Sequence, residues 1–100
     1  MLNFRTYQIS VEFYRHCQNL CLPRHLREQL NRAASSITLN LAEGYGRSGM
    51  ADRRRFYHIA MGSLREVQAI LDLAPSVDAQ LRDLSDKLAA HCYKLIKACR

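Results

Sequence analysis

The stretch RHLREQLNRAASSITLNLAEGYGRSG, residues 24–49, decides the fold of this 100-residue chain. Its apolar residues recur every three or four positions, which is the period of an amphipathic helix and not of a strand. That stripe consists of Leu26, Leu30, Ala33, Ile37 and Leu41. Pro23 fits the first turn of such a helix, where no backbone donor is needed, and Gly44 fits a left-handed cap at its end. We therefore predict a helix over residues 24–43 that leads into a glycine-rich turn.

The same period continues on both sides of this helix and predicts three more, over residues 4–21, 50–73 and 77–99. Their expected core stripes are, in order, Phe4, Tyr7, Val11, Tyr14, Cys17 and Cys21; Phe56, Ala60, Ser63, Val67, Ile70 and Ala74; and Val77, Leu81, Leu84, Leu88, Cys92, Leu95 and Cys99. Ser48 and Ser76 are the expected N-caps of the third and fourth helices. Well-matched helices joined by loops of about two to six residues predict an all-α fold, an antiparallel up-down-up-down four-helix bundle. The length allows a single domain over residues 1–100.

The composition is that of a small basic globular protein. Lys and Arg number 15 against nine Asp and Glu, so the net charge is +6, and 48% of the residues are hydrophobic. These figures exclude a disordered or collagen-like chain, and the positive balance favours an acidic partner such as nucleic acid. No apolar run reaches the ~18 residues of a membrane span, and the first ten residues lack a signal-peptide pattern. We therefore predict a cytoplasmic protein, not bound to membranes, with free cysteines.

Apolar faces wider than one small core needs favour self-association. Leu39 diverges from Leu41 on the second expected helix, and Ile59 diverges from Phe56 on the third. A second apolar flank predicts contact with another copy of the chain, and thus a homo-oligomer. The alternative is scattered surface apolar residues, which monomers tolerate.

The densest charge is Arg53-Arg54-Arg55, in the first turns of the third expected helix, where the helix dipole disfavours cations. Arg53 shares the stripe of Phe56, so we expect it to turn inward to a carboxylate such as Glu43, which leaves the other two arginines free for phosphates. Solvated arginines with incidental partners are the alternative. The lysines of the last helix are weaker candidates, because cations near a helix C-terminus stabilise the dipole without a partner. The candidate nucleic-acid-binding residues are Arg47, Arg53, Arg54, Arg55, Lys87, Lys94, Lys97 and Arg100.

Patterns that would indicate catalysis or a cofactor are weak. Residues 44–49 match G-x-G-x-x-G, but a helix precedes them where a dinucleotide site needs a strand. All four cysteines fall on expected core positions, so a zinc site with His16 or His91 is the weaker interpretation. Polar residues near the stripes could supply an acid and a base, but we interpret them as a structural hydrogen-bond network. This set is Ser36, Asn40, Glu43, Ser63 and Glu66. We predict no enzyme activity, no metal and no cofactor.

Residues 29–47 (QLNRAASSITLNLAEGYGR) and 56–66 (FYHIAMGSLRE) resemble the bacterial four-helix-bundle proteins encoded by intervening sequences of large-subunit (23S) ribosomal RNA. The pattern of that family reads approximately Q-x-x-R-A-x-x-S-I-x-x-N-I-A-E-G-x-G-R and then F-x-x-x-A-x-G-S-x-x-E, and Leu41 replaces its second Ile. The resemblance implies a homopentameric bundle. It also implies a distant similarity to the accessory variability determinant of diversity-generating retroelements, which binds nucleic acid and a reverse transcriptase through a basic surface.

Three functions stay open at this point. The first is a non-enzymatic homo-oligomeric bundle, a pentamer by resemblance, that binds RNA or DNA through its arginine-rich surface, largely by phosphate contacts. The second is a scaffold that docks a partner enzyme such as a reverse transcriptase. The third and weakest is a metal-dependent enzyme. We adopt the first, because helix energetics do not explain the arginine cluster and phosphate contacts do.

Overall fold

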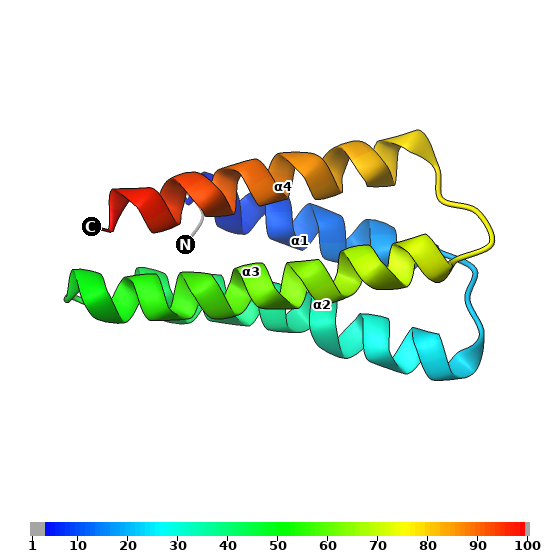
Figure 1. The fold of residues 1–100 in the computed structure, drawn as a ribbon, viewed down its shortest axis with the longest axis horizontal. Helices are drawn as coiled ribbons and strands as arrows, with labels where there is room; N and C mark the ends of the chain where they lie inside the picture. The colour runs from blue at the N-terminus through cyan, green and yellow to red at the C-terminus, as the bar shows by residue number, and fades with distance from the viewer. Residues whose placement is uncertain (1–3, 100) are drawn as a thin grey trace.

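The computed structural model describes residues 4–99, and within them the chain forms four helices and no strand. The helices are α1 (Arg5–Cys17), α2 (Arg24–Tyr45), α3 (Met50–Leu73) and α4 (Ala79–Ala98). Figure 1 shows them running antiparallel, with the start of α1, the end of α4 and the α2–α3 turn together at one end of the molecule. We call this the turn end. The predicted all-α four-helix bundle is confirmed.

Neighbouring helices pack around a square. The most extensive contact is between α2 and α3, and α4 packs against both α1 and α3. The bundle measures 41 × 23 × 21 Å along its principal axes. All four helices contribute buried side chains to one core, for example Phe13, Ile37, Leu64 and Leu88, one from each helix. Among residues 4–99, no helix combines the length and the apolar character needed to cross a bilayer.

Two predicted core stripes are only partly correct: Phe4 and Cys17 of the first, and Ala60, Val67 and Ile70 of the third, are buried as predicted. On α1 the buried apolar residues are Ile9, Phe13 and Cys17, whereas Tyr14 is only half-buried. On α3 the core takes Tyr57 and Leu64, each one position after the predicted residue. Both helices are apolar over more than one stripe, so spacing alone does not select the inward one. The stripes of α2 and α4 are largely as predicted.

The first two helices end at other residues than predicted. The helix α1 stops at Cys17 and not at residue 21. There the Arg27 guanidinium donates from Nη1 to the Cys17 carbonyl oxygen at 2.8 Å, and from Nη2 to the carbonyl of Leu20. An arginine that satisfies these carbonyls makes a further helical turn unnecessary. In contrast, α2 continues through Gly44 to Tyr45.

Gly44 is therefore not a left-handed cap, and no glycine among residues 4–99 has a positive φ. Its role is steric. A Cβ at this position would lie 2.7 Å from Cε1 of Tyr57, a buried ring on α3. Glycine thus permits α2 and α3 to approach closely next to the turn.

The predicted N-caps are also wrong. Gly49 precedes α3 without a side-chain cap, although α3 has the predicted bounds. Asp78 caps α4, because its Oδ1 accepts a hydrogen bond of 2.8 Å from the Leu81 backbone N–H. The helix α4 accordingly begins at residue 79 and not at 77, since an aspartate carboxylate competes well for the orphan N–H groups. Pro23 stands just before α2, not within its first turn.

Candidate nucleic-acid interface

The arginines nearest the α2–α3 turn are held by partners within the protein. We call Glu43, Arg47, Asp52, Arg53 and Arg55 the turn-end cluster. Arg47 contacts Glu43 at 3.0 Å and Asp52 at 3.7 Å, and Arg55 contacts the other Asp52 oxygen at 3.2 Å. These ion pairs neutralise much of the local positive charge.

Aromatic rings hold the same arginines in place. The guanidinium of Arg47 lies 4.9 Å from the Phe56 ring centroid, and that of Arg55 lies 4.4 Å from it. Arg53 donates to the Arg47 backbone carbonyl and lies over the Tyr45 ring. The prediction that Arg53 turns to Glu43 is therefore wrong, because Arg47 occupies that carboxylate.

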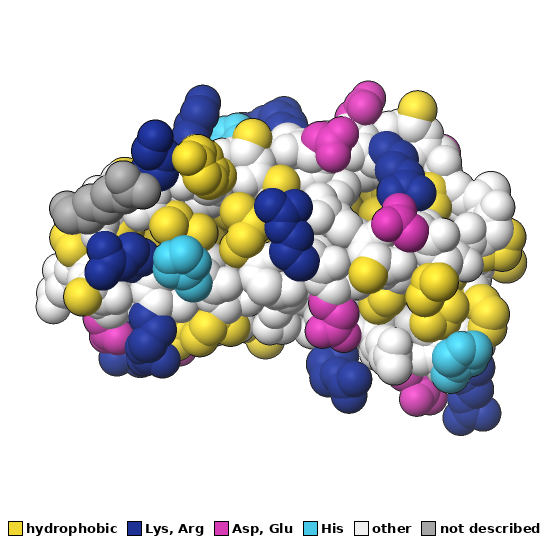
Figure 2. Space-filling view, viewed as in Figure 1, with side chains coloured by type: hydrophobic (Ala, Val, Ile, Leu, Met, Phe, Trp, Pro, Cys, Tyr) yellow, Lys and Arg dark blue, Asp and Glu magenta, His cyan; other side chains and the backbone are white. Residues whose placement is uncertain are grey.

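A second group of cations lines a groove between α3 and α4. The groove has a volume of about 490 Å³. We call it the α3/α4 groove, and its lining residues are Arg54, His58, Met61, Arg65, Tyr93, Ile96 and Lys97. Figure 2 shows basic side chains around an exposed apolar patch between these two helices, toward the turn end. No carboxylate side chain among residues 4–99 lines this groove.

The helical period explains why these residues meet. Arg54, His58, Met61 and Arg65 follow the i, i+4, i+7, i+11 spacing of one α3 stripe. Tyr93 and Lys97 are one turn apart on α4, and α4 packs against α3. At the turn end, Arg54 also donates from Nη1 to the Cys99 carbonyl oxygen at 3.4 Å.

The charge of the chain concentrates along these two segments. Residues 53–65 and 87–99 contain seven of the 15 Lys and Arg but none of the nine Asp and Glu. The remaining eight Lys and Arg are outnumbered by those nine carboxylates. The excess of positive charge in the sequence therefore falls in these two segments, although Asp52, just before the first, pairs with Arg55.

The lysines of α4 lie on two flanks of that helix. Lys97 lines the α3/α4 groove, whereas Lys87 and Lys94 act on His91 together with Arg5 of α1. Burial, followed by the positive charges of Lys94, Arg5 and Lys87, lowers the pKa of His91. Arg100 lies outside the described residues. The predicted set thus divides among the turn-end cluster, the α3/α4 groove and the outer flank of α4.

Among the polar groove residues, sequence reasoning missed His58, Arg65 and Tyr93. A count of carboxylates along the chain would have pointed to them, since a segment with cations and no acids is where positive charge stays uncompensated. The search for consecutive arginines favoured the turn-end cluster, which the adjacent acids neutralise.

The predicted polar network forms only in part. The hydroxyls of Ser36 and Ser63 lie 2.8 Å apart across α2 and α3, and Asn40 donates to the Ser36 carbonyl at 2.8 Å. Glu43 instead pairs with Arg47, and Glu66 is exposed on α3. The two carboxylates therefore do not join the serines.

The cysteines do not all lie in the core. Cys17, Cys92 and Cys99 are buried, but Cys21 is exposed in the α1–α2 connection, so the prediction for it is wrong. Burial raises the pKa of Cys17 to about 12 and that of Cys92 to about 11. In the part of the chain that the structure describes, no three His, Cys, Asp or Glu side chains gather into a possible metal site.

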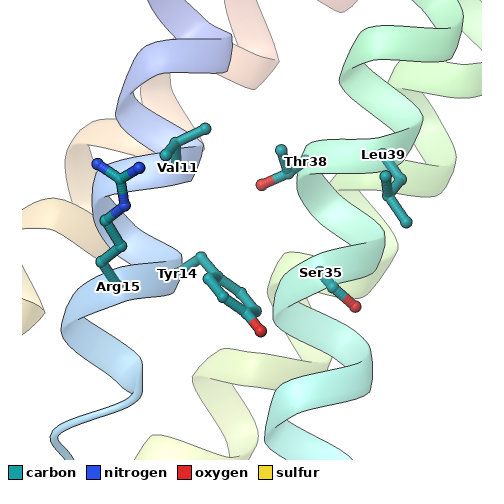
Figure 3. Close-up of a pocket in the computed structure, with 6 residues that line it drawn as sticks. All are labelled: Val11, Tyr14, Arg15, Ser35, Thr38 and Leu39. Atoms are coloured by element: carbon teal, nitrogen blue, oxygen red, sulfur yellow. The ribbon is translucent and has the colours of Figure 1, made fainter.

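An apolar groove of about 320 Å³ lies on the opposite side of the bundle, between α1 and α2. Figure 3 shows Val11 and Tyr14 on α1 facing Ser35 and Thr38 on α2, with Leu39 beside them. Leu39 is 67% exposed while Leu41 is buried, and Ile59 on α3 is 41% exposed. Leu39 and Ile59 therefore point away from the core, as the sequence predicted.

Fold and charge together define a small, basic, all-helical bundle protein. The family model of the 23S rRNA-intervening sequence protein matches residues 3–100, so the chain belongs to that family. A search of curated proteins found no match.

Proposed function

We propose that this chain binds nucleic acid through the α3/α4 groove and the lysines beside it, without catalysing a reaction. The observation that supports this proposal is the lining of the groove: Arg54, Arg65 and Lys97 are among its residues, and no carboxylate side chain of residues 4–99 is. Such a surface attracts phosphates and releases their counterions, which gives affinity with little sequence readout. RNA and DNA are both candidate ligands, and the four free thiols are compatible with a role in the reducing cytoplasm.

We also propose that copies of the chain associate through the opposite, apolar side. Leu39 projects from α2 with 67% of its surface exposed, next to the α1/α2 groove. An exposed leucine beside an apolar groove favours contact with another protein surface, and a second copy supplies the same pair of features. A pentamer is the assembly that the family resemblance implies. Sedimentation equilibrium measures the mass, and a Leu39→Asp variant should shift it toward the monomer.

A salt titration tests the binding proposal. We expect the logarithm of the association constant to fall linearly with the logarithm of salt concentration, with a slope of about −0.9 per phosphate contact for duplex and about −0.7 for a single strand. The variant Arg65→Gln with Lys97→Gln removes two groove cations. Its slope should be less steep by roughly 1.4–1.8, because two phosphate contacts are lost.

The matched control removes two cations from α2, which packs against α1 and α3. Arg24→Gln with Arg32→Gln lowers the net charge equally, and both residues are exposed. This variant should keep the slope of the unaltered protein. Equal losses in the two variants would show that only total charge matters, and an absence of binding at low salt would refute the proposal.

A further inference from the structure

We infer that the α3/α4 groove takes single-stranded nucleic acid, with an unpaired base stacked on the ring of Tyr93. This inference rests on the proposed function and specifies its ligand. The groove is more than a basic surface, because its lining joins cations to an exposed aromatic ring and apolar side chains. Each of the three components suits a different part of a nucleotide.

The apolar part of the groove does not favour phosphate binding. Met61 and Ile96 are half-buried beneath the groove, and Tyr93 at its edge is 57% exposed. A charged phosphate gains nothing from such a surface, whereas the flat face of a base gains from contact with an aromatic ring. Bases in a duplex are stacked on one another, so their faces are unavailable unless the duplex opens.

The cations lie where the backbone of a stacked nucleotide would need them. The Lys97 ammonium is 5.5 Å from the Tyr93 ring centroid. Across the groove, Arg54 and Arg65 mark the two ends of one α3 stripe, and at ~1.5 Å rise per residue they are separated by ~16 Å along the helix. A strand of a few nucleotides along the groove thus has an α3 arginine at each end and the Lys97 ammonium beside the Tyr93 ring.

Other aromatic rings at the turn end are already occupied. Both Arg47 and Arg55 lie over Phe56. Tyr45 stacks on Phe4 with ring centroids 4.5 Å apart. Tyr93 is more exposed than Tyr45, and a single lysine is its partner. It is therefore the ring on this side that a base can reach.

The test compares a 12-nucleotide oligouridylate with a 12-base-pair RNA duplex by fluorescence anisotropy, for the unaltered protein, Tyr93→Ala and Tyr93→Phe. The unaltered protein should prefer the single strand. Tyr93→Ala should weaken single-strand binding about 5- to 100-fold, as loss of one base–aromatic stack does elsewhere. Tyr93→Phe should retain the affinity, and duplex binding and the salt slope should be unchanged, because no phosphate contact is lost.

The result separates this inference from the proposal beneath it. If Tyr93→Ala binds the single strand as well as the unaltered protein does, while Arg65→Gln with Lys97→Gln weakens binding, the stacking inference is overturned and the basic interface stands. A preference of the unaltered protein for duplex also overturns the inference. If the unaltered protein binds neither probe at low salt, both fail. Circular dichroism checks that each variant keeps its helices.

Discussion

The turn-end cluster and the α3/α4 groove both contain arginine, yet they use it differently. In the turn-end cluster Arg47 and Arg55 share Asp52 and cover the Phe56 ring. In the α3/α4 groove, the surface that carries Arg65 and Lys97 is lined by no acidic side chain of the described part of the chain. The first group holds the α2–α3 turn together, and the second leaves its charge available to a ligand.

This difference shows that charge density in a sequence is a poor guide to charge available for binding. Three consecutive arginines are the densest charge in the sequence, but Asp52 pairs with Arg55, and Glu43 pairs with the nearby Arg47. Isolated cations on different helices, such as Arg65 on α3 and Lys97 on α4, meet in a groove to which helix packing brings no acidic side chain of residues 4–99. The comparison leads to three predictions, which distinguish a structural end from a binding face.

The largest effect should come from close packing beside the turn. Gly44→Ala places a Cβ 2.7 Å from a buried Tyr57 ring atom, whereas Gly62→Ala on α3 places one in open space. Both glycines lie in helices, so both variants gain about 1 kcal/mol of helix propensity, and overpacking at residue 44 should make their unfolding free energies differ by roughly 1–3 kcal/mol. Urea unfolding measures both. Equal stability of the two variants would mean that the turn end is not tightly packed.

A smaller effect should follow from neutralising the turn-end cluster. Arg47→Gln with Arg55→Gln removes ion pairs and cation–π contacts at exposed positions, so we expect a stability loss of roughly 0.5–1 kcal/mol. The salt slope of nucleic-acid binding should stay that of the unaltered protein, because these arginines contact Asp52, Glu43 and Phe56 in place of phosphate.

The salt slope of this variant is compared with that of the groove variant, Arg65→Gln with Lys97→Gln. Both double variants lose the same charge, so a difference in slope reflects where the charge was removed. A slope that falls as much for the turn-end variant as for the groove variant would contradict the division of the two regions.

How much the sequence predicts can be read from particular residues. The stripe of Leu30, Ile37 and Leu41 in α2 is buried as predicted, because these residues recur at helical spacing on one side of the helix, from which the exposed Leu39 diverges. Tyr57 replaces Phe56 in the core because the two are adjacent on a helix with apolar residues on several sides. Local periodicity cannot tell which of two adjacent apolar residues is buried, because contacts with the other helices decide this.

The candidate site was harder to predict than the fold. Arg54 and Lys97 were both predicted, but not that they line one groove with Arg65 and Tyr93, which depends on the pairing of α3 with α4. The pairing of Arg47 with Glu43 was missed for another reason. Arg47 lies beyond the end of α2 at Tyr45, and the turn there, in which the Arg47 N–H donates to the Gly44 carbonyl at 3.1 Å, places it beside Glu43.

The smallest effect concerns the flank of α4 beyond the groove, where positive charges surround His91. Burial, then Lys94, Arg5 and Lys87, lower the pKa of this histidine from its ordinary 6.5. The neutral form is thus favoured in the folded state, so its contribution to stability is present above pH 6.5 and is lost as the pH falls through the lowered pKa. Lys94→Gln should raise the pKa toward 6.5, since one like charge is removed.

NMR titration of the His91 ring proton measures this change. The control is Lys97→Gln, which removes the same charge from the α3/α4 groove and is not among the charges that lower the pKa of His91. It should leave the midpoint where it is. If both variants shift the pKa of His91 equally, Lys97 acts on this histidine as strongly as Lys94 does. The division of the α4 lysines between the groove and the outer flank would then be wrong.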